Sequence, residues 1–138
     1  MADLSITAGN VKWISGVRPQ AVKGGANITR GQAVRADTTG EMVLAQADDT
    51  STATVRGIAI TDGNDGGDML IAGPGAKINC GATTVAGTAY VLSSAAAGAI
   101  APIGDLTNED MPNFLFWGSG TAEVTLVCQI SPAAIPAA

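Results

Sequence analysis

The amino-acid sequence predicts an all-β fold, either a small antiparallel β-sandwich of the jelly-roll kind or a β-barrel. Apolar and polar residues alternate with a period of two over several short segments, which is the pattern of half-buried strands. Turn residues, mostly Gly, separate these segments at roughly eight to twelve residues, a spacing typical of sandwiches and barrels. Ala contributes 25 and Gly 18 of the 138 residues, against five aromatic residues. Such a core consists of thin layers of aliphatic side chains within one domain.

The clearest strand is predicted at residues 123–130, where every second residue from Val124 to Ile130 is apolar. Further strands are predicted at residues 42–45, 54–60, 69–72 and 89–92, with turns at 39–40, 62–64, 66–67 and 73–75. At most one short helical turn is expected, at residues 105–111, where Pro112 ends it.

The chain is expected to consist of three parts. Residues 1–25 are weakly patterned and predict an extended N-terminal arm. Residues 26–131 hold the β-sandwich or barrel domain, and residues 132–138, which contain two prolines, predict an extended C-terminal tail.

A weak internal repeat runs through the central domain. Residues 28–36 match residues 84–92 at an offset of 56. In both, a Gly turn leads into a strand, a Gly-containing loop follows, and a second apolar strand comes next. Later strands that end at Gly57 and Gly118 also resemble each other. The order of these features predicts two hairpin-plus-strand units stacked in one domain.

Charge is scarce and unevenly distributed. Charged residues make up 14% of the chain, against roughly 25% in a typical soluble domain. The first 36 residues hold five bases and one acid, whereas the rest holds two bases and eleven acids. The scarcity of charge predicts a surface that is largely interface. The basic arm either docks on an acidic partner or sister subunit, or is simply solvated.

Membrane and nucleic-acid functions do not fit this composition. The mean hydropathy is +0.28, yet no stretch approaches the ~18 to 20 apolar residues of a membrane span. Residues 1–5 lack the basic and apolar regions of a secretion signal. Nucleic-acid binding is not expected, because the bases are spread out and only one Trp lies among them.

Catalysis is not expected, so the protein is predicted not to be an enzyme and to need no cofactor. The chain has no His, which removes the usual general base and the commonest metal ligand. It has no phosphate-binding Gly-Lys loop, and the turn around Ser119 lacks a base. A small enzyme or metal-binding β-domain is therefore the least favoured hypothesis.

Two further features have competing interpretations. Residues 62–68 contain three carboxylates and an amide, which suits Ca²⁺, but an acidic turn between strands is favoured and no metal site is predicted. Cys80 and Cys128 are expected to be free thiols in the core, although a disulfide between them is geometrically possible.

The aromatic strand at residues 114–117 is apolar on both faces. Strict alternation places Phe114 and Phe116 on one face and Leu115 and Trp117 on the other. One face fills the core, and the other is exposed unless a partner covers it. Trp117 is therefore either an interface anchor or part of a second core face.

Several segments together resemble the small decoration, or cement, proteins of tailed-bacteriophage capsids. They are the turn and strand Thr29-Arg30-Gly31-Gln32-Ala33-Val34, the acidic loop at 47–54, the turn and strand at 86–91, and the Ala-Pro-x-x-Asp-Leu-Thr motif at 101–107. The resemblance covers residues 26–131. It implies a β-rich homo-oligomer that binds the outer surface of the assembled shell across junctions of major capsid protein subunits.

The leading functional hypothesis is therefore a virion decoration protein, made in the bacterial host cytoplasm and located on the outer capsid surface, where it stabilises the phage head. Its expected partners are the major capsid protein and further copies of itself, as a homodimer or homotrimer. The alternative is an adhesion or receptor-binding module on a phage head or tail fibre. The residues expected to contact the capsid or another subunit are Lys12, Trp13, Arg18, Lys23, Arg30 and Trp117.

Overall fold

Short antiparallel strands joined by tight turns run through the computed structural model, which describes residues 3–45, 55–93, 96–103 and 114–128. The prediction of a small all-β fold is confirmed. The one helical element of the described residues is a 3₁₀ turn, η1 (Ala8–Asn10). The helical turn expected at 105–111 and the tail at 132–138 lie outside the described residues.

The strands follow one another along the whole described chain. They are β1 (Lys12–Gly16), β2 (Gln20–Lys23), β3 (Ala33–Ala36), β4 (Met42–Leu44), β5 (Gly57–Ala59), β6 (Asp68–Ala72), β7 (Ala76–Asn79), β8 (Ala89–Leu92), β9 (Ile100–Pro102), β10 (Phe114–Trp117) and β11 (Glu123–Thr125).

Strands β2 to β6 form the first of two structural units. Their sheet has the order β2-β6-β5-β3-β4, and every strand pairing in it is antiparallel. A parallel bridge between Gly24 and Met42 joins its two ends, and the Gly25 N–H donates to the Met42 carbonyl oxygen at 2.8 Å. The sheet therefore curls into a small barrel. Its interior is filled by buried Ile28, Val34, Met69, Ile71 and their neighbours.

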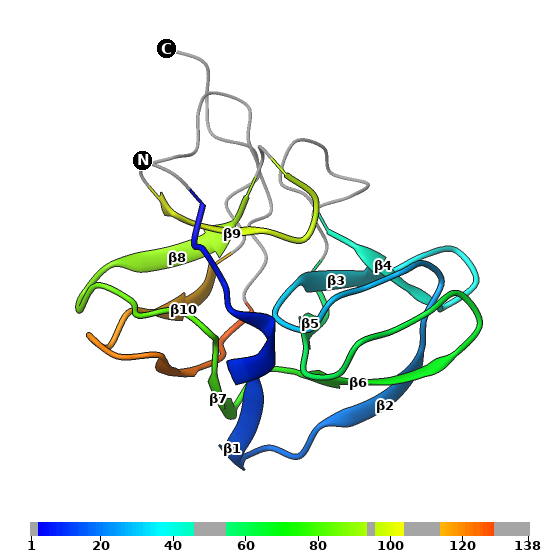
Figure 1. Ribbon diagram of the computed structural model, residues 1–138, viewed down its shortest axis with the longest axis horizontal. Coiled ribbons are helices and arrows are strands. Elements are labelled where there is room, and N and C mark those ends of the chain that lie inside the picture. Colours follow the sequence, from blue (N-terminus) through cyan, green and yellow to red (C-terminus); the bar gives the residue numbers. More distant parts are fainter. Residues whose placement is uncertain (1–2, 46–54, 94–95, 104–113, 129–138) are drawn as a thin grey trace.

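Strands β7 to β11 repeat this arrangement in a second unit. In the first unit β2 pairs with β6, and β3 lies between β4 and β5. In the second unit β7 pairs with β11, and β8 lies between β9 and β10. The Val127 N–H donates to the Leu115 carbonyl oxygen at 2.7 Å and thereby connects the segment after β11 to β10. The described residues thus form two copies of one five-strand arrangement, which lie side by side in Figure 1.

The repeat extends to individual residue pairs. Ala33 lies opposite Ile58 in the first unit, as Ala89 lies opposite Trp117 in the second. Backbone hydrogen bonds recur in the turns as well: Gln32 to Thr29 and Thr88 to Val85, both 3.2 Å, and Gly31 to Ala59 at 2.7 Å and Gly87 to Gly118 at 3.0 Å. The short sequence match at 28–36 and 84–92 is therefore part of a repeat that runs from β2 to β6 and from β7 to β11.

One detail of the predicted repeat is wrong. The sequence match aligns Gly57 with Gly118, but strand pairing aligns Gly57 with Phe116, because they lie opposite Val34 and Tyr90 respectively. Equivalent positions of the two units are defined by their place in the hydrogen-bonded register, so a Gly near the end of both strands does not make Gly57 and Gly118 equivalent.

The two units share one large core. Buried residues of the second unit, among them Tyr90 and Phe116, whose rings stack at 5.4 Å, belong to the same cluster as Ala33 and Ile58 of the first unit. Ala33 and Ile58 are fully buried, although they lie on the face of β3 and β5 that points away from the first barrel's interior. The outer face of the first unit is therefore covered by the second unit.

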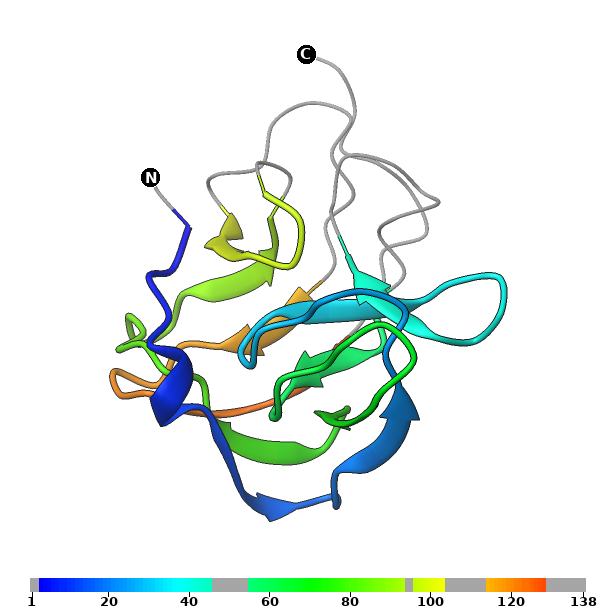
Figure 2. The same ribbon diagram turned by 45° about the vertical axis from the view of Figure 1, so that its right-hand side comes forward.

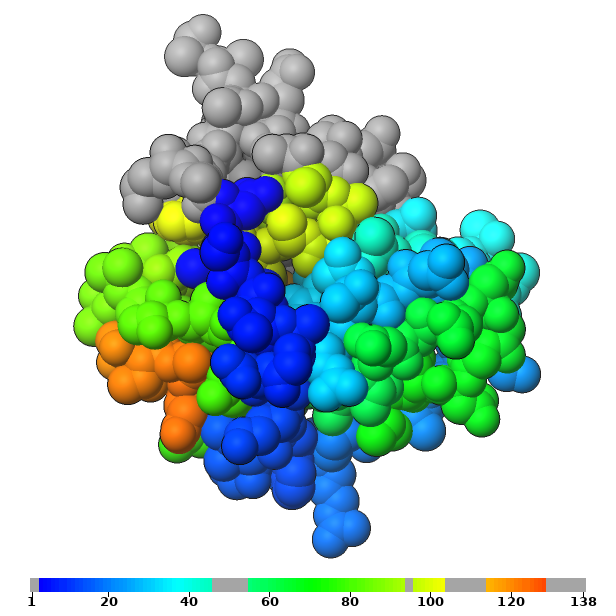
Figure 3. All heavy atoms as spheres, in the orientation of Figure 1, coloured from blue at the N-terminus to red at the C-terminus, as the bar shows by residue number. Residues whose placement is uncertain are grey.

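The N-terminal segment is extended, and it is hydrogen-bonded to both units. Strand β1 pairs with β7 of the second unit, while β2 is itself an edge strand of the first. Ahead of β1, the Leu4 N–H donates to Ile100 and the Thr7 N–H to Gly81, at 2.7 and 2.8 Å. Figure 3 shows this segment, in dark blue, lying along the seam between the two units. Residues 3–25 thus pack as part of the β-structure in the described chain.

Candidate functional site

Strands β1 and β2 form one exposed border of the molecule, which we call the basic edge (Lys12, Trp13, Val17, Arg18 and Lys23). Figures 1 and 2 show the two strands following each other along this border. All five residues are exposed, and within the described part of the chain no carboxylate pairs with the three cations. The Trp13 indole N–H donates to the Val17 carbonyl oxygen at 2.9 Å, which fixes the ring against the surface. The basic edge therefore presents cations and apolar surface together.

Arg30 does not belong to the basic edge. It lies in the turn before β3, where its guanidinium is 3.7 Å from the Asp62 carboxylate. The Arg30 backbone N–H also donates to the same carboxylate oxygen at 3.0 Å. Arg30 therefore ties the turn before β3 to the connection between β5 and β6.

The acidic segment at 62–68 connects β5 to β6. One of its carboxylates, Asp62, is held by Arg30, and the Gly66 N–H donates to the Gly24 carbonyl oxygen at 2.7 Å. Across residues 3–45, 55–93, 96–103 and 114–128, no three Cys, Asp or Glu side chains gather as a metal site would require.

Trp117 is 58% exposed on β10, so it is not part of a second core face. A register shift between Phe114 and Phe116 breaks the alternation predicted for this strand. As a result Leu115 and Phe116 are both fully buried, and Phe114 packs edge-to-face on Trp117 at 5.1 Å instead of sharing a face with Phe116. A β-bulge adds one unpaired residue and rotates the following side chains, which is the physical reason for the difference.

Trp117 belongs to an apolar row that crosses the second unit. Trp117 lies opposite Ala89 of β8. On the other side of β8, Pro102 of β9 lies opposite Tyr90, and Ile103 directly follows Pro102. One step further along the antiparallel register places Ile103 beside Ala89. Ile103 is 49% exposed. We call Trp117, Ala89, Ile103 and the neighbouring exposed Val127 the Trp117 face.

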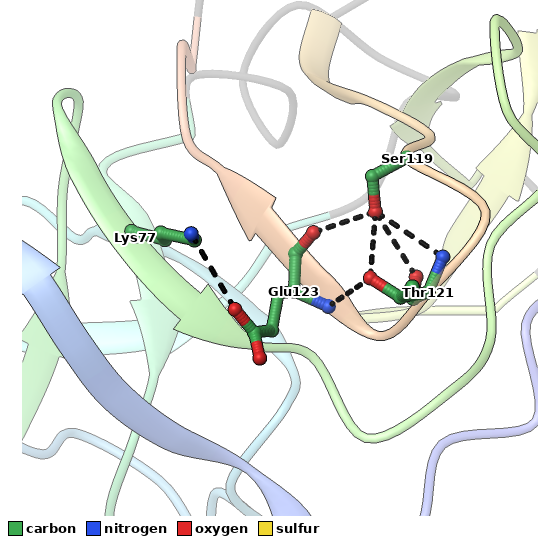
Figure 4. Close-up of polar contacts among 4 residues, drawn as sticks. All are labelled: Lys77, Ser119, Thr121 and Glu123. Atoms are coloured by element: carbon green, nitrogen blue, oxygen red, sulfur yellow. Dashed lines mark hydrogen bonds and ion pairs between the residues drawn. The ribbon is translucent and has the colours of Figure 1, made fainter.

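A groove of about 450 Å³ runs beside Trp117 and Val127. Figure 4 shows the polar network at its margin. The Ser119 hydroxyl donates to the Glu123 carbonyl oxygen at 2.7 Å, and the Glu123 N–H donates to the Thr121 hydroxyl at 3.2 Å. The Glu123 carboxylate lies 3.4 Å from the Lys77 ammonium. This network fixes the turn that joins β10 to β11, and it occupies the Ser119 hydroxyl.

The equivalent place in the first unit also carries a groove, of about 660 Å³, over β2 and β6. Its lining includes Lys23 and Leu70, the first of which belongs to the basic edge. Both grooves thus lie over equivalent strand pairs, β2–β6 and β7–β11, whereas Trp117, which lines only the second groove, corresponds to buried Ile58.

The two cysteines are free and buried, as expected. Burial raises the pKa of the Cys128 thiol to about 12 and also raises the pKa of Cys80. Both therefore act as small apolar side chains in the core.

The described residues define a two-unit β-protein with an exposed basic edge and an exposed apolar face. Comparisons of the chain with protein-family models, with curated proteins and with solved structures found no match. Within the described residues, no helix has the length and apolar character needed to cross a membrane.

Sequence reasoning identified Trp117 and four of the basic-edge residues but missed Val17, Ile103 and Val127. Val127 lies on the polar face of the strand predicted at 123–130, where a lone apolar residue among Glu123, Thr125 and Gln129 is a signal of exposed apolar surface. Ile103 becomes evident only once the register of β8 and β9 is known.

Proposed function

We propose that this protein is a structural decoration protein of a tailed-bacteriophage capsid, without enzymatic activity. It binds the outside of the assembled head across junctions of major capsid protein subunits, as a homodimer or homotrimer, and stabilises the shell. The resemblance of residues 26–131 to that family supports the proposal. The observation that carries it is the basic edge, where Lys12, Arg18 and Lys23 are exposed on the same border of the molecule as Trp13 and Val17.

A surface of this kind suits an acidic protein partner. Cations attract a partner of opposite charge, and an indole ring with adjacent aliphatic surface supplies the buried area that holds it. The rest of the chain is acidic, with two bases and eleven acids after residue 36, so the basic edge is the region that an acidic shell surface attracts. When one oligomer reaches several shell subunits at once, modest individual contacts produce tight attachment.

The cations of the basic edge have a second, simpler role, because charged side chains on edge strands prevent edge-to-edge aggregation whether or not a shell is bound. Shell binding separates the two roles. The protein is added to heads that lack it, and bound protein is measured after sedimentation. Arg18→Glu is compared with Arg56→Glu, which reverses one charge at an exposed position outside the basic edge.

We expect Arg18→Glu to bind at least about tenfold more weakly than the wild type, and Arg56→Glu to bind like the wild type. Added salt should weaken wild-type binding more than it weakens the residual binding of Arg18→Glu. Equal binding of Arg18→Glu and the wild type would contradict the role of the basic edge. Deletion of residues 1–25 is unsuitable for this test, because it removes both β1 and β2.

A further inference from the structure

The Trp117 face has a buried counterpart in the first unit. The exposed row Trp117, Ala89 and Ile103 corresponds by strand register to Ile58, Ala33 and Ala45. All three counterparts are fully buried, whereas Trp117 and Ile103 are 58% and 49% exposed. The second unit covers this row in the first unit, and no equivalent cover exists over the second unit's own row within the described residues.

The cover includes a specific hairpin. The turn between β8 and β9 brings Gly98 to the first unit's row, where the Ala33 N–H donates to the Gly98 carbonyl oxygen at 2.8 Å. The Gly98 N–H in turn donates to the Ala45 carbonyl oxygen at 2.6 Å. Gly98 has a φ of 77°, a conformation that favours Gly, and a Cβ there would also lie 2.9 Å from Leu44 Cδ2 and 3.1 Å from Gln32 Cβ.

The first unit has the equivalent hairpin, and among the described residues nothing packs on its tip at Gly40. Gly40, between β3 and β4, matches Gly98 between β8 and β9, since Met42 and Ile100 occupy equivalent register positions opposite Ala36 and Leu92. Both glycines have positive φ, 88° and 77°. No side chain or backbone atom lies within 4 Å of a Cβ built on Gly40. Figure 2 shows this hairpin, in cyan, projecting from the body.

The hairpin is held in a defined shape by its own hydrogen bonds. The Asp37 carboxylate accepts bonds from the Thr39 N–H at 2.8 Å, the Thr39 hydroxyl at 2.7 Å and the Glu41 N–H at 3.0 Å. An ordered hairpin loses little conformational entropy on docking, which favours its use as a contact element.

We propose that the Trp117 face binds a second copy of this chain, head to tail, with the β3–β4 hairpin of the second copy docked where the β8–β9 hairpin docks within the chain. The contact between the two units supplies the template. Within the described residues, each copy has one such face that is exposed and one such hairpin whose tip makes no contact. The surfaces differ on the two sides of this contact, so it is heterologous and closes into a ring when the rotation between copies permits. The proposal rests on the self-association that the proposed function includes and names the contact that produces it, but its tests do not require binding to a shell.

The first test measures self-association of the purified full chain by sedimentation velocity over a range of concentrations. Trp117→Ser is compared with Leu70→Ser, which also replaces an exposed apolar residue but lies in the first unit. We expect Trp117→Ser to raise the dissociation constant at least about 30-fold, the effect of losing a hot spot, and Leu70→Ser to leave it within about threefold. A monomeric wild type, or equal loss in both variants, would overturn the proposal.

The second test distinguishes head-to-tail contact from a two-fold contact. Thr38→Cys, in the hairpin, and Ile103→Cys, on the Trp117 face, are prepared separately and then mixed under mild oxidation. Both native cysteines are buried and do not compete. We expect disulfide-linked pairs in the mixture and no linked pairs in either variant alone. Linkage of either variant with itself, or no linkage in the mixture while the wild type self-associates, would overturn the head-to-tail arrangement.

Discussion

Replacing Gly81 by Ala tests the packing of the N-terminal segment into the seam between the two units. A Cβ at this position would lie 2.7 Å from the Thr7 carbonyl oxygen and 2.9 Å from methyl groups of Ile6 and Val11. Gly81 also has a φ of 82°, which an L side chain adopts at a cost of about 1–2 kcal/mol. Gly66 has nearly the same φ, 80°, with open space around it, so Gly66→Ala measures the backbone cost alone.

The difference between the two variants reports the steric conflict. Forcing one extra methyl group into a packed site costs about 1–3 kcal/mol. Displacement of the N-terminal segment also weakens the hydrogen bond from the Thr7 N–H to the Gly81 carbonyl oxygen, which contributes about 1 kcal/mol. We therefore expect Gly81→Ala to lower the free energy of unfolding by about 2–4 kcal/mol more than Gly66→Ala does.

Urea unfolding followed by Trp fluorescence measures both losses, with the midpoint and slope fitted for each variant. Equal losses in Gly81→Ala and Gly66→Ala would show that residues 3–11 do not pack in the seam as described. A double-mutant cycle adds a direct control. A Cβ on Gly31 would lie 2.7 Å from Ile6 Cγ2, so Gly31→Ala should cost less in an Ile6→Ala background.

Three further predictions follow from buried or hydrogen-bonded groups. A disulfide reagent at pH 8 should modify Cys80 and Cys128 only at the rate of unfolding, because burial raises their pKa values; fast modification of the folded protein would refute this. The hydrogen bond from the Thr39 hydroxyl lowers the pKa of Asp37 below its ordinary value of 3.8. The ionised Asp37 carboxylate therefore stabilises the fold fully above pH 3.8, and this stabilisation disappears as the pH falls through the lowered pKa of the folded protein. The stability difference between the wild type and Asp37→Asn, measured by urea unfolding, should therefore shrink toward pH 2, and a constant difference would contradict it. Tyr90→Phe should cost about 1–2 kcal/mol in thermal unfolding, because the Val85 N–H loses its hydroxyl acceptor at 2.9 Å; no loss would contradict that bond.

The fold class was predictable because period-two patterning and Gly turns are local signals. The strands predicted at 42–45, 69–72 and 89–92 correspond to β4, β6 and β8. The repeat was visible only at 28–36 and 84–92, where the same turn and strand demand the same residue types. Its remainder was hidden, because β2 and β7 share their place in the register but not their sequence, and exposed Trp117 corresponds to buried Ile58.

The candidate surfaces were predictable in part. Lys12, Arg18 and Lys23 were predicted as contact residues from the charge distribution alone, and the structure shows that they are exposed. Arg30 was grouped with them by sequence position, yet its ion pair with Asp62 depends on a contact 32 residues away. The exposure of Trp117 depended on a bulge at Phe114–Phe116, and a bulge is set by the pairing with β8 rather than by local propensity.

The proposed function is tested most directly by cryo-electron microscopy of the virion that carries this chain. We predict density for the two-unit fold on the outside of the head, in hundreds of copies, with β1 and β2 facing the major capsid protein. Absence of the chain from the shell would contradict it, and so would its presence in tens of copies or fewer on a fibre, which is the outcome expected of an adhesion module.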